Sequence, residues 1–541
     1  MKFDKLMKQE LRKMVRRRSK TKRLLVLSVV LAGLISCFTL VSFSDSPAAG
    51  VRSVSTVDLG GMSSQLNTVG FALGGRYALV APYAPVNGDD NHFIYIVDTQ
   101  NPGAPPIRKN LNFCFYPSNL VVTPQNGAFV RATCAGSPDG SVAPGEVINY
   151  YQLQTANNKV RLLGSSLLTF YIPPVPGGDP AFTPTSFGIG NQSKVLIYTN
   201  GASIFSASLD QGYNYQVDIV PLSSYQPQVD PNDPTADFDE ITGLSVDQAT
   251  DIVTVTVTGR LQGQNFSQLY FYRVNEGAGS AFDTLDLLKL VDKEQFPDGA
   301  TMTWGSNAVV SPDSKFGYFA LDDGSVCSVR LAGDITAPKI TVLGQYASMV
   351  ASDPANRGAR LVEYDATSSS LAVVKKGTVL YVRRPAYGHG SPGVRRPAYV
   401  KEAPAAVVGR LSADGSFTGP SEFTDFGLGE QEISNLVFDL SGNGFLTTGS
   451  GSVLSVSQSG LQVLGTAVPR IGQLVSDSVG ANLIGVSSYG VDADNNIVQP
   501  GSLVIMSLTL SSIASKRALL DHSVTAGTVN HIRRPCSVQR R

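Results

Sequence analysis

Two copies of the hexapeptide VRRPAY, at residues 382–387 and 394–399, have the most distinctive binding chemistry in the sequence. An arginine guanidinium is planar and matches carboxylate or phosphate oxygens, and a tyrosine ring adds a stacking surface. The pattern predicts a site for an acidic protein, an acidic polysaccharide or a phospholipid headgroup; a solvated loop enlarged by a chance duplication is the alternative. The predicted partner-binding residues are Arg383, Arg384, Tyr387, Arg395, Arg396 and Tyr399.

Two acidic stretches offer oxygen ligands for a hard cation, and calcium is the candidate ion. The second stretch begins like a D-x-D-x-N calcium loop, but Ile497 replaces the glycine expected there. Polar loops without metal are the alternative, and no other cofactor is expected. The candidate calcium ligands are Asp230, Asp233, Asp237, Asp239, Asp492, Asp494 and Asn496.

Cysteine and histidine offer little catalytic chemistry. Cys114 and Cys134 flank one predicted strand and would form a disulfide if their own strands are neighbours; two small buried side chains are the alternative. Cys327 lies in an alternating strand and is expected in the core. The four histidines are scattered, and no G-x-S-x-G motif is present. We therefore assign no catalytic residue.

The elements that must position these residues are short strands separated by turns. In Ala308–Leu331, a turn at Ser311–Ser314 and a tight turn at Asp322–Gly324 separate three apolar runs. Similar units recur at intervals of roughly 40–70 residues, which is typical of propeller blades. The eight candidate units are Val69–Thr99, Asn119–Leu153, Ser186–Leu209, Ile241–Val274, Ala308–Leu331, Leu361–Leu411, Leu436–Val456 and Leu474–Leu508.

Two of these units resemble known repeats. His92–Ile107 resembles the LVIVD-type propeller repeat, and Leu120–Cys134 resembles the repeat of bacterial lactonase-like (YVTN-type) propellers. The resemblance implies an extracytoplasmic ring that acts as a binding platform, since most relatives look like binding proteins and some are sugar-lactone hydrolases. No catalytic set of those enzymes can be placed on this chain.

The predicted fold is therefore all-β: a single β-propeller of seven or eight four-stranded blades over residues 45–510, with an insert loop at 382–399. Val51–Leu59 alternates like a strand without a neighbour in sequence, and we expect it to complete the last blade and close the ring. Residues 511–541 form a polar, basic tail.

The N-terminal segment predicts export. Residues 1–23 hold 11 Lys/Arg against two acidic residues, and Leu24–Phe43 is an uncharged apolar run long enough to cross a bilayer as a helix. We predict a transmembrane anchor or signal segment at 24–44, which places the protein in the bacterial periplasm or at the cell surface, anchored to the inner membrane. A secreted form after signal cleavage and a lipoprotein attached through Cys37 are the alternatives.

Charge and motifs together favour binding over catalysis. After residue 23 the chain carries 32 basic and 41 acidic residues, which disfavours nucleic acid as a partner. The predicted function is a membrane-tethered scaffold for an envelope protein or glycan. The alternative is a metal-assisted hydrolase or lyase of a lactone or sugar.

Overall fold

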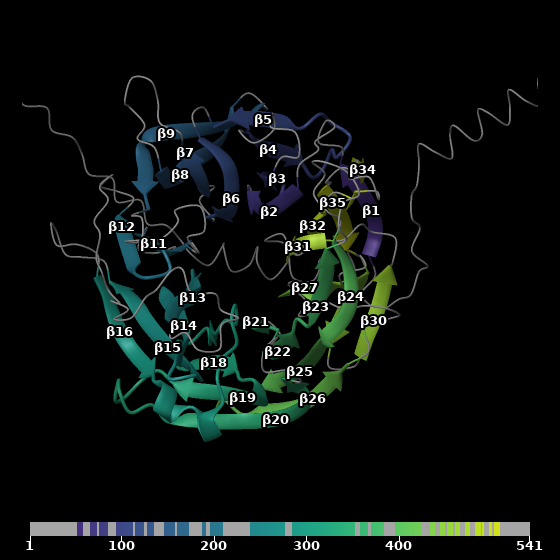
Figure 1. Ribbon diagram of the computed structural model, residues 1–541. Helices are drawn as coiled ribbons and strands as arrows, with labels where there is room; N and C mark the ends of the chain where they lie inside the picture. The colour runs from purple at the N-terminus through teal and green to yellow at the C-terminus, as the bar shows by residue number, and fades with distance from the viewer. Residues whose placement is uncertain are drawn as a thin grey trace, which may run out of the picture. The chain divides into compact units, whose positions relative to one another are not determined.

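The computed structural model shows a chain of β-strands arranged around a ring (Figure 1). It describes residues 51–508 except for the following gaps: 58–64, 73–74, 85–92, 112–113, 124–126, 135–144, 157–158, 173–186, 191–194, 209–237, 276–283, 352–357, 366–368, 384–394, 425, 427–432, 439–443, 449–451, 458–459, 466–470, 477–481, 488–489, 492–496 and 500–502. The basic head, the apolar segment and the C-terminal tail of the sequence lie outside the described residues. Within the described part, no helix is both long and apolar enough to cross a membrane.

The first four sheets are antiparallel and are built from strands that follow one another in sequence. The first contains β2 (Gln65–Ala72), β3 (Tyr77–Ala84), β4 (Phe93–Asp98) and β5 (Ile107–Asn110). The second contains β6 (Cys114–Val122), β7 (Gly127–Cys134), β8 (Gly145–Ala156) and β9 (Lys159–Tyr171). The third contains β10 (Phe187–Gly190), β11 (Val195–Thr199) and β12 (Ile204–Ser208). The fourth contains β13 (Phe238–Asp247), β14 (Ile252–Leu261), β15 (Gln264–Asn275) and β16 (Thr284–Val291).

The next four sheets repeat this design, with insertions in two of them. After the short helices η2 (Lys293–Gln295) and η3 (Pro297–Gly299), the fifth contains β17 (Val309–Val310), β18 (Phe316–Ala320), β19 (Asp323–Arg330) and β20 (Ile340–Val350). The sixth contains β21 (Arg360–Asp365), β22 (Ser370–Lys375), β25 (Ala405–Leu411) and β26 (Phe417–Phe423). The seventh contains β27 (Ile433–Phe438), β28 (Gly444–Thr448), β29 (Val453–Ser457) and β30 (Gly460–Gly465). The last contains β31 (Ile471–Ser476), β32 (Asn482–Ser487), β35 (Leu503–Leu508) and β1 (Val51–Val57).

Two further strand pairs are inserted between the second and third strands of their sheets. One is β23 (Thr378–Arg383) with β24 (Arg395–Glu402), and the other is β33 (Gly490–Val491) with β34 (Ile497–Gln499). Each forms a separate two-stranded sheet in the described part of the chain.

Hydrophobic clusters between consecutive sheets hold the ring together. The middle strands are buried on both faces, as in β14 (IVTVTVTGRL), because a neighbouring sheet packs on each side. Separate clusters join the first sheet to the second, the second to the third, and so on to the seventh. β27 lies against β31, and a further cluster joins Leu503 and Ile505 of the last sheet to Ala78 and Val80 of the first. This radial repetition is the arrangement of a β-propeller.

The ring closes as the sequence predicts. β1 pairs with β35 in antiparallel register, from Val57 opposite Leu503 to Val51 opposite Leu508. The first described strand therefore completes the last sheet, which removes one exposed sheet edge. Each of the eight predicted units overlaps one of the sheets, and the predicted all-β architecture of repeated four-stranded antiparallel sheets is confirmed.

Local turn chemistry explains the best-defined sheet, which contains β17–β20. Ser311 Oγ donates to Asp313 and accepts the amides of Lys315 and Phe316, so the turn is held by its own side chains. At the next turn Gly324 has φ +86°, a conformation that favours glycine. Cys327 is fully buried, as expected.

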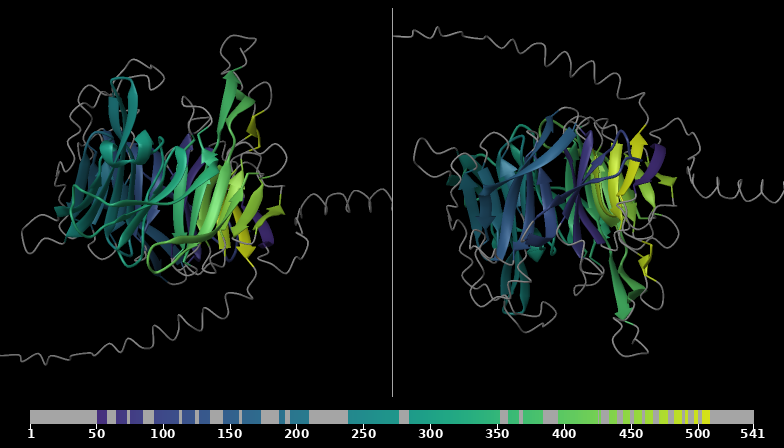
Figure 2. Two further views of the ribbon diagram at one scale, coloured as in Figure 1. Left: turned by 90° about the horizontal axis from the view of Figure 1, so that it is seen from below. Right: turned by 90° about the horizontal axis from the view of Figure 1, so that it is seen from above.

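The described turns that join the second strand of a sheet to the third, such as those at 262–263 and 321–322, lie on one side of the ring, which we call the hairpin face. Figure 2 shows β14–β15 and β23–β24 standing out from the ring on this same side. The β14–β15 turn has positive φ at both Gln262 and Gly263, which suits a two-residue hairpin. The hairpin face therefore carries the elements that reach furthest from the ring.

Candidate binding surface on the hairpin face

The two VRRPAY copies pair with each other. In the β23–β24 hairpin, Arg383 lies opposite Arg395, Val382 opposite Arg396, and Leu380 opposite Tyr399. Arg384 and Tyr387 lie outside the described residues. Along its described arms, the segment predicted as an insert loop is an extended hairpin.

Proline fits this hairpin because the pair is only two strands wide. Pro397 lies opposite Tyr381, beside a register irregularity between Leu380 and Tyr381. Each strand of a two-stranded sheet has an open edge, where a residue without an N–H group is tolerated. A proline therefore does not prevent an extended conformation here.

The register concentrates positive charge. Arg383 and Arg395 occupy directly opposite positions in this register, and like charges at such positions generally destabilise a sheet. The segment 378–402 holds five Lys/Arg residues and one acidic residue, within a chain that is otherwise acidic after residue 23. An anionic partner would relieve this repulsion, so the charge pattern favours a binding role.

The base of the hairpin is anchored by a buried ion cluster, which we call the clamp: Arg360, Lys375 and Glu402. Arg360 and Glu402 are fully buried and Lys375 is almost so. A Glu402 carboxylate oxygen, Oε1, lies 3.1 Å from Arg360 Nη2 and 4.0 Å from Lys375 Nζ. The second carboxylate oxygen accepts the amide N–H of Gly358.

Main-chain carbonyls complete the clamp. Arg360 donates to the carbonyls of Gly358 and, at 2.8 Å, Met349, and Lys375 donates to Val350 at 3.2 Å. Desolvation lowers the pKa of Lys375, although the nearby Glu402 carboxylate opposes that shift. Buried charges with this many partners hold one geometry, so the hairpin leaves the ring from a fixed base.

Trp304 lies on the tip of a turn that contacts the same cluster. Ser306 N donates to Thr303 O at 3.0 Å, and Gly305 supplies the positive φ of +73° that the turn requires. Trp304, the sole tryptophan of the chain, is 49% exposed. An aromatic side chain of this size at an exposed turn is a typical anchor in protein interfaces.

Two hydrogen bonds connect this turn to the hairpin base. Thr303 Oγ1 donates to Gly358 O at 3.0 Å, and Gly358 N donates to Glu402. Thr301 also bonds to Asp322, in the tight turn between β18 and β19, which places the segment on the hairpin face. Buried hydrogen bonds therefore link the Trp304 turn to the base of the arginine hairpin on the same face of the ring.

Half-buried glutamates lie on the first strands of two sheets. Burial raises the pKa of Glu240 in β13 to about 7, and it raises the pKa of Glu363 in β21 to about 7. Neither residue lies in a metal-binding cluster, because no three His, Cys, Asp or Glu side chains converge in the described part of the chain.

The calcium predictions fall mostly outside the described residues. Asp239 is the one described member; it is buried in β13, opposite Gly259 of β14. Asp230, Asp233, Asp237, Asp492, Asp494 and Asn496 lie outside the residues whose side chains are described.

Cys114 and Cys134 are bonded, with an S–S distance of 1.97 Å. They face each other at the end of the β6–β7 pair, and both are buried. The bond therefore closes this hairpin at the end opposite its turn.

Comparisons with known proteins bear on the fold alone. No protein-family model matches the chain, and no curated protein matches its sequence. Among solved structures, the chain is similar to Chaetomium thermophilum Sqt1 bound to the N-terminus of the ribosomal protein L10, with 11% identity, a TM-score of 0.48, and coverage of 84% of this chain and 98% of that one. Sqt1 of the same organism in a second structure gives 9% identity, a TM-score of 0.47, and coverage of 84% and 99%.

A third similar structure is the Myceliophteria thermophila Cps50 (Swd1) β-propeller domain, with 10% identity, a TM-score of 0.32, and coverage of 57% of this chain and 79% of that one. At these scores we base no argument on the likeness, and the ring rests on the strand pairing described above. The resemblance to lactonase-like and LVIVD-type repeats stays a prediction.

Sequence reasoning missed the clamp and Trp304. The clamp residues are spread over more than 40 positions, and each is flanked by ordinary strand residues. A Thr-Trp-Gly-Ser turn next to a predicted first strand was the available signal for Trp304, because glycine favours the third position of such a turn.

Proposed function

We propose that this protein is a binding scaffold whose hairpin face holds an acidic segment of a protein partner. The observation that carries the proposal is the joining of two recognition elements by a buried clamp. Trp304 supplies an exposed aromatic anchor, and the β23–β24 hairpin supplies paired arginines. A rigid base lowers the entropy lost on binding, because the elements are already in place.

The charge pattern selects the partner. Each of the two opposite arginines can form an ion pair with a carboxylate of the partner. Binding would then reduce the repulsion between like charges and make the hairpin more stable in the complex. We therefore expect binding to weaken as salt rises, since exposed charges are screened. An acidic protein segment is preferred over an acidic glycan because Trp304 offers an apolar contact on the same face as the charges.

The fluorescence of Trp304 tests this proposal, because no other tryptophan contributes to the signal. Poly-L-glutamate is titrated into the full protein at low salt, and we expect a saturable change in emission. The double variant Arg383→Gln/Arg395→Gln should move the midpoint several-fold higher, since each exposed pair contributes up to about 1 kcal/mol. Arg76→Gln, an exposed arginine in the turn between β2 and β3, is the matched control and should leave the midpoint unchanged.

Two results would contradict the proposal. An equal response to poly-L-lysine would show that charge does not select the partner. Equal or tighter binding of polygalacturonate would assign the face to an acidic glycan. For the metal-assisted hydrolase, no observation within the described residues adds support, and that function stays a prediction.

We also propose that the ring has eight blades and is held outside the cytoplasm by residues 24–43. The sheets already described support the count, and the basic head followed by an apolar run supports the placement. Protease treatment of intact spheroplasts tests the placement: the body should be digested while the cytoplasmic head is protected. Protection of the body would contradict it.

A further inference from the structure

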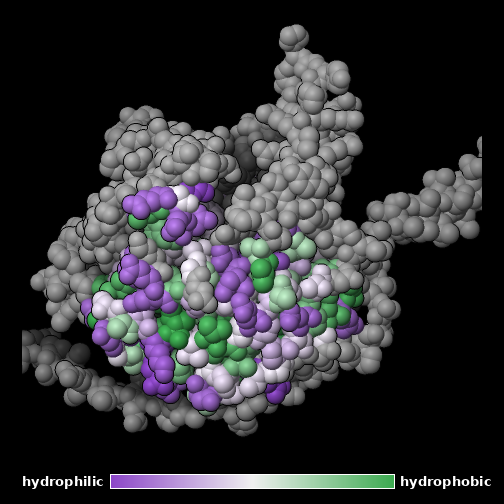
Figure 3. Space-filling view, turned by 60° about the horizontal axis from the view of Figure 1, so that its bottom comes forward, coloured by the Kyte–Doolittle hydropathy of each residue, from purple (hydrophilic) through white to green (hydrophobic). Residues whose placement is uncertain are grey.

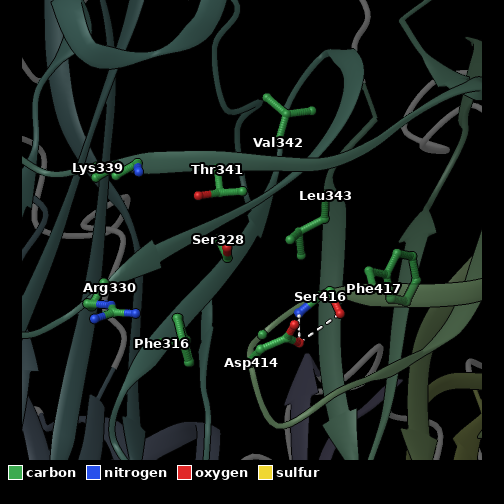
Figure 4. Close-up of a pocket in the computed structure, with 11 residues that line it drawn as sticks. Phe316, Ser328, Arg330, Lys339, Thr341, Val342, Leu343, Asp414, Ser416 and Phe417 are labelled. Atoms are coloured by element: carbon green, nitrogen blue, oxygen red, sulfur yellow. Dashed lines mark hydrogen bonds between the residues drawn. The ribbon is translucent and has the colours of Figure 1, made fainter.

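A pocket, which we call the rim pocket, lies at the outer rim of the ring, away from the clamp. It has a volume of about 550 Å³ and is formed by β18, β19 and β20 together with the turn between β25 and β26. Figure 4 shows Arg330 and Lys339 on one side of this pocket and Phe417 on the other, with Ser328 and Leu343 between them. A pocket of this size is large enough to take a side chain and its neighbours.

The walls of the rim pocket are apolar. Phe316, Leu343 and Phe417 belong to the cluster that joins the fifth and sixth sheets, and they line the pocket where that cluster reaches the rim. The guanidinium carbon of Arg330 lies 5.8 Å from the centroid of the Phe316 ring. An apolar group entering the pocket would therefore contact aromatic rings on two sides.

Two cationic side chains of the pocket are available to an anion. Within the described residues, neither Arg330 nor Lys339 forms an ion pair. The pocket's own carboxylate, Asp414, accepts the amide of Ser416 at 3.0 Å and its hydroxyl at 2.7 Å, and these bonds hold the pKa of Asp414 below its usual value. Ser328 is buried, and no hydrogen bond of its hydroxyl is found in the described part of the chain.

An open strand edge runs beside the pocket. β20 pairs with β19 and is the terminal strand of its sheet in the described chain. Val342 on this strand lines the pocket and is 47% exposed. Figure 3 shows apolar patches between polar ones on this side of the ring.

We propose that β20 and the rim pocket form a second docking site, for an extended segment of a partner protein that carries an apolar side chain with an acidic side chain two residues before it and two residues after it, so that all three lie on one face of the added strand. The segment adds to the open edge of β20, as extended peptides do at exposed sheet edges. Its apolar side chain enters between Phe316 and Phe417, and its carboxylates face Arg330 and Lys339. This site is separate from the hairpin face.

The probe is the synthetic peptide acetyl-EGFGE-amide, titrated into the full protein and followed by calorimetry. We expect measurable binding that weakens about fivefold to tenfold in Arg330→Gln/Lys339→Gln, since two exposed ion pairs are lost. Arg383→Gln/Arg395→Gln is the matched control, and it should leave this binding unchanged. A peptide methylated on the phenylalanine nitrogen should bind more weakly, because it loses a main-chain donor for strand addition.

Several outcomes would overturn the proposal. They are absence of binding at millimolar peptide, equal binding of acetyl-KGFGK-amide, full affinity of the methylated peptide, or an unchanged affinity in Arg330→Gln/Lys339→Gln. Self-association of the protein that Arg330→Gln/Lys339→Gln abolishes would instead assign the edge to a second copy of this chain. Loss of binding only in the hairpin variant would move the peptide to the hairpin face.

Discussion

The two hairpins that stand out on the hairpin face are built on different principles. β14 and β15 are the second and third strands of their own sheet, paired continuously from Ile252 opposite Arg273 to Leu261 opposite Gln264. β23 and β24 form a separate pair inserted into the sixth sheet, with arginines opposite each other. The first hairpin inherits its rigidity from the ladder of the sheet.

The second hairpin lacks that continuous ladder, and a clamp replaces it. Its last residue, Glu402, is fully buried against Arg360. The comparison shows that a hairpin with unfavourable internal charge can still be held in place if its base is fixed. We therefore expect changes at the clamp to affect the arginine hairpin while leaving β14–β15 intact.

The largest effect should follow Glu402→Ala. Removing the carboxylate leaves Arg360 and Lys375 buried without their anionic partner. Breaking a buried ion pair in this way lowers the free energy of unfolding by about 3–5 kcal/mol. Urea denaturation should show this loss, and Glu422→Ala, which removes an exposed carboxylate on β26 of the sixth sheet, should cost under about 1 kcal/mol. Equal effects of the two variants would show that the clamp does not hold the hairpin base.

A covalent bond takes the place of a clamp in a third hairpin, β6–β7. The disulfide between Cys114 and Cys134 closes a chain segment with a sequence separation of 20. Its reduction should lower the free energy of unfolding by about 3 kcal/mol, because the unfolded chain gains freedom. The variant Cys114→Ser/Cys134→Ser should be less stable by a similar amount and insensitive to dithiothreitol. A reductant effect that persists in this variant would contradict the assignment.

The parent sheets of the two projecting hairpins should respond alike to pH. The folded-state pKa values of Glu240 and Glu363 are raised to about 7 from 4.5, so the folded protein binds more protons than the unfolded chain between these values. Stability should therefore fall as pH rises from about 4.5 to about 7. Glu363→Gln should remove its part of that loss, worth about 2–3 kcal/mol at pH 8, and be nearly neutral at pH 4.

Urea midpoints at the two pH values check this prediction, with Glu240→Gln as the counterpart in the other sheet. We expect a similar gain in the free energy of unfolding at pH 8 in both variants. That result would show that the sheets beneath the two hairpins do not differ in this respect. A larger gain at pH 4 than at pH 8 would contradict the raised pKa values.

The smallest effect should come from the β14–β15 tip. Gly263 has φ +74°, and a Cβ atom there would meet no other atom within 4 Å. Gly263→Ala should therefore cost only the backbone strain, about 1 kcal/mol. Thermal denaturation measures this cost, and poly-L-glutamate binding should not change. A loss of binding would show that the β14–β15 tip also contacts the partner.

Local sequence patterns were sufficient to predict much of the ring. Short apolar runs alternate with Asp- and Gly-containing turns, such as Asp322–Gly324, and each turn fixes the pairing of its flanking strands. The lone strand at Val51–Val57 could be assigned to the last sheet because a closed ring of repeats needs one more strand where its two ends meet. These features depend on neighbours in sequence or on closure of the repeat.

The binding surface depends on contacts between distant residues, which the sequence does not reveal. Arg360, Lys375 and Glu402 look like ordinary charged residues at strand ends, and their burial follows only from the packing of the fifth and sixth sheets. The sequence marks the two VRRPAY copies as a duplication, but their register could not be read from it because proline obscures the strand pattern.

Hydrogen exchange with and without poly-L-glutamate tests the central claim most directly, because it locates the bound polymer on the protein. We predict slower exchange in residues 303–306, 378–383 and 395–402, on the hairpin face, and no change in the turn at 247–252 between β13 and β14. Protection confined to that turn, or equal protection of all turns, would contradict a binding surface built from Trp304, the clamp and the arginine hairpin.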